Sequence, residues 1–402
     1  MPKHVIKIDY PPERMAANAR RVQAAKALIA VDRTPVWVGT YDRYCLERRG
    51  VSYDEYFSGP ETYLYHKIMN QVWAIQNIPD DRCQAPGITI YPDFENAANA
   101  SAFGAEVVSD RGGQPWTHPV MSSPQDVDRL EIPAPDAGLW GKRFAWYEIM
   151  QRKLGDYRLI FNGQEAPIII LPPDPDPEGP FTIAQQLVGV DLYAWLALFP
   201  DACHNLMHKI TTSLIQGHCH TRRRYPKPAR TSCTVINDGA EVISPAMFRK
   251  FCVPYDDRIY AALGKGMADG RSKHMCGKID HLLPVLVEHR ISSLWGFGHV
   301  VEPEVVADAL GGRCWLRGNV SPVLLLKGRP EEVEQAAKRV LAAFARYGGL
   351  ILADGFSIAP GTPLENIAAL VRASEAWGPV EPSGSQMVNA SWSGVAHTSS
   401  GG

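Results

Sequence analysis

Residues 271–277, with the sequence RSKHMCG, place His274 and Cys276 two positions apart at the end of a predicted buried strand. Because residues i and i+2 of a strand point to the same face, the imidazole and the thiol are expected to face the same space. Both side chains are zinc ligands, and α/β barrels hold their reactive groups at the carboxyl ends of their strands. Taken alone, the pair is more typical of a core cysteine beside a histidine that bonds to a backbone carbonyl, so the rest of the chain must decide.

Strand and helix patterns alternate strictly in the second half of the chain. Apolar strand-like segments at 232–236, 272–276, 291–295, 314–317 and 350–353 are followed by helical patterns at 245–263, 278–288, 304–310, 330–347 and 363–376. Such alternation indicates parallel strands with right-handed crossovers, as in a doubly wound sheet or a (β/α)₈ barrel. No G-x-G-x-x-G fingerprint follows a strand, which favours the (β/α)₈ TIM barrel.

The first half supplies the remaining barrel segments. An Ala/Arg-rich helical pattern at 11–30 predicts an N-terminal helical extension over residues 1–32, and the barrel is expected over 33–378. A short strand at 35–39 and a continuous apolar run at 166–171 fit barrel strands. Residues 379–402 are rich in Ser and Gly, so a disordered C-terminal tail is expected there.

Composition excludes several classes of protein. The net charge of −2 gives no basic face for nucleic acid and no polybasic patch for a membrane. No uninterrupted apolar run of about 18 residues is present, and the N-terminus lacks the apolar core of a signal peptide, so a cytoplasmic location is expected. The eight cysteines show no repeated C-x-x-C spacing, which argues against a disulfide framework or a zinc finger.

The order of several motifs resembles the uroporphyrinogen decarboxylase superfamily, and more closely its branch of corrinoid and cobalamin-linked methyltransferases. The motifs are TPVWVGTYDRY, FENAANASAFGAEV, GPFTIAQQLVG, NDGAEVISPAMFRKFCVPY, HMCGKIDHLLPVL, LRGNVSP and GGLILADGFSIAPGTPLENI, over roughly residues 35–376. The resemblance implies a (β/α)₈ barrel with its active site at the C-terminal mouth. The decarboxylase itself carries Gln-Ala-Gly-Arg after its first strand, where this chain keeps only Arg43 of that cationic cradle.

The methyltransferase branch, by this resemblance, binds zinc through an H-x-C pair and a second cysteine in the last strand. His274 and Cys276 match the pair, but Phe356 stands at the position of the second cysteine. We expect Asp354 to supply the third ligand; Asp238 or Glu241 could do so instead, or the pair could bind no metal.

The resemblance implies transfer of a methyl group between a small methylated substrate and a corrinoid, with zinc assisting. The chain has no Asp-x-His-x-x-Gly segment, so the cobalamin would come on a partner protein or as free cofactor. A homodimer is compatible with the sequence. The alternatives are a decarboxylase of the uroporphyrinogen type and a catalytically inactive barrel that binds a small molecule.

Further residues are expected at the barrel mouth because they follow predicted strands. The predicted catalytic residues are Asp238, Asp354 and His299, and the predicted substrate contacts are Trp37, Tyr41, Asp42, Asp93 and Phe356. For each aspartate, helix capping or a loop hydrogen bond is an equally good interpretation. For His299 a surface loop position is an alternative.

Overall fold

A parallel sheet forms the centre of the fold. The computed structural model describes residues 2–109, 113–173, 178–226, 233–264 and 270–378; the predicted C-terminal tail, 379–402, lies outside them. The strands are β1 (His4–Ile8), β2 (Ile88–Ile90), β3 (Val107–Val108), β4 (Trp116–Thr117), β5 (Tyr157–Phe161), β6 (Gln164–Ala166), β7 (Ile168–Ile170), β8 (Cys233–Ile236), β9 (Arg271–His274), β10 (Ser293–Trp295), β11 (Trp315–Val320) and β12 (Leu350–Asp354).

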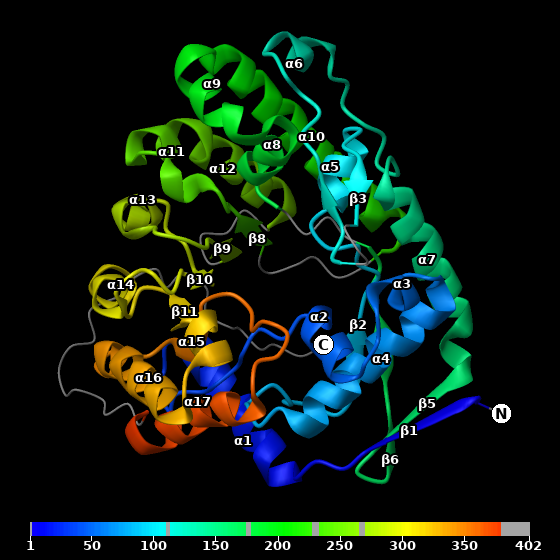
Figure 1. The fold of residues 1–402 in the computed structure, drawn as a ribbon, viewed down its shortest axis with the longest axis vertical. Helices are drawn as coiled ribbons and strands as arrows, with labels where there is room; N and C mark the ends of the chain where they lie inside the picture. The colour runs from blue at the N-terminus through cyan, green and yellow to red at the C-terminus, as the bar shows by residue number, and fades with distance from the viewer. Residues whose placement is uncertain (1, 110–112, 174–177, 227–232, 265–269, 379–402) are drawn as a thin grey trace, which may run out of the picture.

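Helices cover the outside of this sheet (Figure 1). They are α1 (Pro12–Lys26), α2 (Asp42–Arg48), α3 (Tyr53–Tyr56), α4 (Pro60–Asn77), α5 (Ala98–Ala102), α6 (Gln125–Arg129), α7 (Leu139–Lys153), α8 (Pro180–Val188), α9 (Leu192–Leu198), α10 (Pro200–Arg224), α11 (Pro245–Phe251), α12 (Val253–Leu263), α13 (Leu283–Glu288), α14 (Pro303–Leu310), α15 (Pro322–Lys327), α16 (Pro330–Phe344) and α17 (Leu364–Trp377).

The five predicted strand–helix units of the second half are confirmed as elements. Strands β8 to β12 form one parallel sheet in the order β12-β11-β10-β9-β8, and each strand is followed by at least one helix. The chain is therefore an α/β fold with parallel strands, as predicted. A large core joins the outward face of these strands to the surrounding helices.

Serine and proline define where two of these helices begin. Ser244 precedes Pro245 and accepts a hydrogen bond from the Met247 amide at 3.2 Å, while Ser321 precedes Pro322 and starts α15 in the same way. A serine at the N-cap satisfies an amide that has no partner inside the helix, and proline at the first helical position lacks an amide to satisfy. The start of α15 is thereby fixed directly after β11, and the start of α11 is fixed after the 3₁₀ turn that follows β8.

Both edges of the five-stranded sheet continue as single bridges rather than full strands. Val36 pairs in parallel with Leu352 of β12, and Glu178 pairs in parallel with Ile236 of β8. Strand β2 pairs with β7 instead of with the segment around Val36. The strand predicted at 35–39 is thus reduced to one bridge in the described chain.

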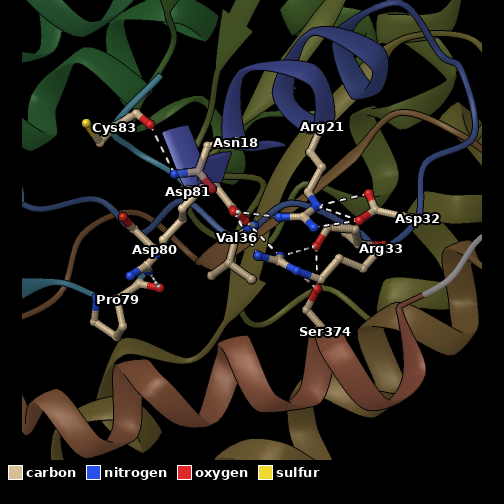
Figure 2. Close-up of polar contacts among 12 residues, drawn as sticks. Asn18, Arg21, Asp32, Arg33, Val36, Pro79, Asp80, Asp81, Cys83 and Ser374 are labelled. Carbon is tan, nitrogen blue, oxygen red and sulfur yellow. Dashed lines mark hydrogen bonds and ion pairs between the residues drawn. The ribbon is translucent and has the colours of Figure 1, made fainter. Parts of the chain in front are cut away.

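Two aspartates satisfy the backbone amides on the free side of this first segment, and Figure 2 shows the contacts of one of them, Asp81. Asp81 accepts the Val36 amide at 2.8 Å and holds both terminal nitrogens of Arg33 at 2.8 Å. Asp80 accepts the Val38 amide at 3.0 Å and pairs with Arg82. Because backbone donors in a fold need acceptors, these carboxylates take the place of a neighbouring strand.

The N-terminal segment contains a helix and a strand. The helix predicted at 11–30 is present as α1, whose Val22 and Ala25 pack against Ile351 of β12. The sequence analysis did not predict β1, which pairs with β5 in a separate small sheet at the periphery (Figure 1).

One stretch, Pro180–Leu198, is long and apolar enough to cross a membrane by length and composition. In the structure it is interrupted by a 3₁₀ turn between α8 and α9. Its apolar residues, among them Phe181, Leu187 and Trp195, belong to the main core. Packing inside the protein therefore accounts for the apolar character of this stretch.

A buried ion pair lies behind the strand that carries His274. Lys273 and Asp256 are both fully buried and in contact, and Lys273 also donates to the Asn237 side chain. Lys273 points away from His274 because successive strand residues face opposite sides. The pair ties β9 to α12 and to the turn that precedes Asp238.

Replacement of Lys273 by Met should destabilise the protein by about 3–5 kcal/mol, because it leaves the Asp256 carboxylate buried without a cation. Urea denaturation followed by circular dichroism measures the change. The exposed Lys7 is the matched control, and Lys7→Met should stay within about 0.5 kcal/mol of the wild type. Equal stability of the two variants would contradict the role given to the ion pair.

Candidate metal and substrate site

Strand pairing aligns four inward side chains in one row. Ile236 pairs with His274, His274 with Trp295, and Trp295 with Arg317. Paired residues in register lie on the same face of a sheet, so an aromatic, a cationic and a metal-binding side chain share one interior surface.

His274, Cys276 and Asp238 bring a nitrogen, a sulfur and an oxygen together. The Cys276 Sγ lies 3.2 Å from His274 Nε2, and Asp238 Oδ1 lies 3.6 Å from that nitrogen. Asp238 Oδ1 also accepts the Cys276 amide at 3.0 Å. In the part of the chain that the structure describes, these three are the group whose donor atoms all lie within 4.8 Å of one another.

The backbone around Trp295 holds the histidine ring from its other side. His274 Nδ1 lies 2.8 Å from the Trp295 carbonyl, which can only accept, so Nδ1 carries the proton. The next residue, Gly296, has φ of +66°, and a Cβ there would lie 2.2 Å from His274 Cε1. Glycine is therefore required both by the left-handed backbone and by the closeness of the ring.

The electrostatic environment suits a bound cation. Burial raises the pKa of the Cys276 thiol well above its ordinary value, and the nearby Asp238 carboxylate raises it further. Burial lowers the pKa of His274, which keeps the imidazole neutral, so Nε2 carries a lone pair that faces Cys276 Sγ. A neutral imidazole whose other nitrogen donates to a carbonyl is the usual arrangement of a metal-binding histidine, and a bound cation would convert the thiol to thiolate. The three residues thus fit a zinc ion.

Asp354 lies outside this group, although it was predicted as the third ligand. Its two oxygens accept hydrogen bonds from the amides of Gly39 at 2.6 Å and of Phe356 at 3.1 Å, and the Gly39 bond joins β12 to the segment that follows Val36. The Phe356 ring lies 4.9 Å from the His274 ring and 5.5 Å from that of Tyr41. Of the oxygen ligands considered from the sequence, the structure brings in Asp238.

The other predicted site residues divide into two groups. Tyr41 and Phe356 line the cavity in front of His274, and Trp37 lines a neighbouring cavity. Asp42 is instead held by Lys67 and by the Asn70 amide at 2.7 Å. Although burial opposes ionisation, Lys67 lowers the pKa of Asp42. Asp42 is therefore already paired within the protein.

Asp93 and His299 do not line these cavities in the described chain. The Asp93 backbone is held by the Tyr63 hydroxyl, and His299 is exposed, packed beside Gly355. His299 therefore occupies the surface loop position that the sequence left open.

Two cavity residues were not selected from the sequence. Glu95 lines the cavity with His274, accepts a hydrogen bond from Gln114 at 3.2 Å and has φ of +56°, which is unusual for a side chain of this size. Burial, reinforced by the charge of Asp93, raises the pKa of Glu95 to about 8. Arg317 lies in the motif LRGNVSP, but the sequence analysis gave it no role of its own. Neither an unusual φ nor an inward-facing arginine can be read from residue spacing.

Two cavities meet at the row of inward side chains. The smaller, about 90 Å³, is lined by His274, Asp238 and Glu95. The larger, about 540 Å³, opens between residues 37–41 and β2. Tyr41, Trp295 and Phe356 line both, so the two spaces are adjacent.

Comparison with known proteins places these features in a family context. Residues 17–377 match the sequence model of the family described as Uroporphyrinogen decarboxylase (URO-D). A uroporphyrinogen decarboxylase from Coxiella burnetii is 24% identical over 373 residues, covering 85% of this chain and 91% of that protein. The methylcobamide:CoM methyltransferase MtbA from Methanosarcina mazei is 25% identical over 304 residues, covering 70% and 78%.

A solved structure confirms the fold class. The chain aligns with a methyltransferase from Methanosarcina mazei at a TM-score of 0.62 and 22% identity, over 90% of this chain and 98% of that one. At this identity the likeness concerns the fold. The relatives include decarboxylases and methyltransferases at similar identity.

Glu178, at the edge of β8, should make stability depend on pH. Burial raises the pKa of Glu178 to about 8. Between its ordinary value and pH 8 the folded protein keeps a proton that the unfolded chain loses, so this group lowers stability as pH rises through that window. Glu178→Gln should flatten the fall in unfolding free energy between pH 6 and about 8.5. Urea denaturation at several pH values measures it.

The exposed Glu331 supplies the control for this measurement, since Glu331→Gln changes the same group without burial. That variant should keep the wild-type pH profile. A Glu178→Gln profile parallel to the wild type would show that this carboxyl ionises normally in the folded protein.

Proposed function

The chain belongs to the uroporphyrinogen decarboxylase family, and we propose that it transfers a methyl group from a small methylated compound to a corrinoid, with a zinc ion held by His274, Cys276 and Asp238. The supporting observation is the convergence of nitrogen, sulfur and oxygen donors beside a cavity, with the histidine tautomer fixed by the Trp295 carbonyl. Three protein ligands and an open side are typical of a catalytic zinc site.

Each nearby residue has a task in this proposal. When bound, zinc acts as a Lewis acid on the heteroatom that carries the methyl group. Asp238 orients the Cys276 backbone, and Tyr41 and Phe356 exclude water from the reacting methyl group. The methyl–heteroatom bond would break as the carbon–cobalt bond forms with the electron pair that cob(I)alamin would supply, and the heteroatom would take up a proton. Glu95 holds a proton at neutral pH because of its raised pKa, and it is our candidate donor.

The second part of the proposal concerns the fold, which we assign as a (β/α)₈ barrel. We assign the segment around Val36, β2, β7 and the strands β8 to β12 as the eight strands of a (β/α)₈ barrel over residues 33–378. Residues 1–32 would be its N-terminal extension. The bridges of Val36 and Glu178 at the two sheet edges support this assignment. The corrinoid would bind at the mouth, on a partner protein or free.

Replacement of Cys276 by Ser should lower zinc content and methyl transfer together, because it removes the sulfur ligand. Zinc is measured by elemental analysis of protein purified without chelator, with about one ion per chain expected in the wild type. Methyl transfer is followed by the spectral change from cob(I)alamin to methylcobalamin, with methoxy, methylthio, methylamine and halomethane donors.

Two further variants make this experiment decisive. Cys219 is an exposed free cysteine on α10, so Cys219→Ser should leave zinc and activity unchanged. Phe356→Cys places a second thiol near His274 and should tighten zinc binding. Negligible zinc in the wild type and in both Cys276→Ser and Phe356→Cys would refute the metal site. The absence of enzyme-dependent methylation across the donors would favour a barrel that only binds small molecules.

Decarboxylation of uroporphyrinogen is the second candidate, since a relative of that name aligns over most of its length. A tetrapyrrole with eight carboxylates needs several free cations. Of the three arginines in the described lining of the two cavities, Arg82 is paired with Asp80, which leaves only Arg43 and Arg317 for eight carboxylates. We therefore expect no stepwise loss of carboxylates when the protein is incubated with uroporphyrinogen. Chromatographic counting of the product carboxylates measures this, and loss at an enzymatic rate would reverse the assignment.

A further inference from the structure

The larger cavity exists because the barrel wall is open between its first two strands. It is bounded by residues 37–41 on one side and by residues 87–89 on the other, and it encloses about 540 Å³. Asp80 and Asp81 satisfy the amides of Val38 and Val36 along the open edge. A volume of this size accommodates a small organic molecule, and the cavity adjoins the donor atoms of His274, Cys276 and Asp238 through shared aromatic side chains.

Arg317 extends from β11 into this cavity with most of its hydrogen-bonding capacity unused. Its Nε donates to the Trp37 carbonyl at 2.9 Å, and its guanidinium lies over the Trp37 ring, 5.2 Å from the centroid. In the described parts of the chain, no carboxylate lies within ion-pair distance and neither terminal nitrogen has a hydrogen-bond partner. Partly enclosed charges are normally paired, so these donors are available to a ligand.

The negative charges that act on Arg317 are those of Asp354 and Asp80, and both carboxylates are already hydrogen-bonded within the protein. Arg82, the other cation of the lining, is neutralised by Asp80 at 2.7 Å. The oxygens of Asp354 are taken up by backbone amides. Lys26 of α1 lies over the same Trp37 ring at 5.7 Å and adds a second positive charge nearby. Burial lowers the pKa of Arg317, but an arginine stays protonated at neutral pH.

We propose that Arg317 binds the carboxylate of the substrate in this second chamber, so that the substrate is a small organic acid whose opposite, methylated end reaches His274 and Cys276. The proposal rests on the proposed function for the methyl group and names the substrate class. A planar guanidinium with two free terminal nitrogens matches the two oxygens of a carboxylate. Trp37, Tyr41 and Trp295 provide aromatic surfaces for the apolar part of the molecule.

The test measures binding alone, so it requires neither zinc nor cobalamin. Benzoate and its neutral analogue benzamide are titrated into the full-length protein, and the quenching of tryptophan fluorescence is followed, since Trp37 and Trp295 line the chamber. The wild type should bind benzoate at least about tenfold more tightly than benzamide. Arg317→Met should abolish this preference, and Arg317→Lys should retain part of it.

The controls separate this proposal from that of the metal site. Arg223→Met removes an exposed arginine of α10 and should bind as the wild type does. Cys276→Ser should lose zinc but keep the preference for benzoate. A wild type that binds benzoate no better than benzamide would overturn the proposal without any variant, as would an unchanged preference in Arg317→Met. Tighter binding of benzenesulfonate or phenyl phosphate than of benzoate would overturn the assignment to a carboxylate.

Discussion

Two neighbouring carboxylates accept hydrogen bonds from the amides of Val36 and Val38, and these bonds determine the shape of the site. In a regular sheet, the carbonyls of an adjacent strand would accept these amides. Asp80 and Asp81 accept them instead, so β2 is free to stand apart and to pair with β7. The carboxylates are buried, and each is matched by a cation, Arg82 or Arg33. The chamber beside the row of inward side chains is the consequence.

Strand β9 serves two purposes because its residues alternate. Lys273 faces α12 and is neutralised by Asp256, whereas His274 faces the interior beside Trp295. Lys273 of this ion pair also donates a hydrogen bond to the side chain of Asn237, the residue before Asp238. Lys273 thus connects the packing of α12 to the turn that carries the oxygen donor Asp238.

The alternation of strand and helix patterns and the spacing of a few residues made much of the fold predictable from the sequence. The alternating patterns of the second half gave the parallel strands and their helices, and the H-x-C spacing predicted a His/Cys contact that the structure contains. The third donor was harder to choose, because Asp238 and Asp354 both follow strands. Only the three-dimensional structure shows that backbone amides occupy the Asp354 oxygens. The gap between the Val36 segment and β2 depends on Asp80 and Asp81, whose side chains accept hydrogen bonds that a neighbouring strand would otherwise accept. The hydrophobic pattern of the sequence does not reveal such a replacement.

The acids around the cavities follow a simple electrostatic rule. Asp42, Asp80 and Asp81 each have a cation in contact, whereas Glu95 and Glu178 have none in the described chain. Burial therefore raises the pKa of both glutamates to about 8, and near neutral pH they are largely uncharged. Because neutral acids do not repel an anion, neither glutamate opposes the binding of an anion at Arg317. In the proposed reaction, Arg317 would bind the organic acid while Glu95 keeps a proton for the leaving group.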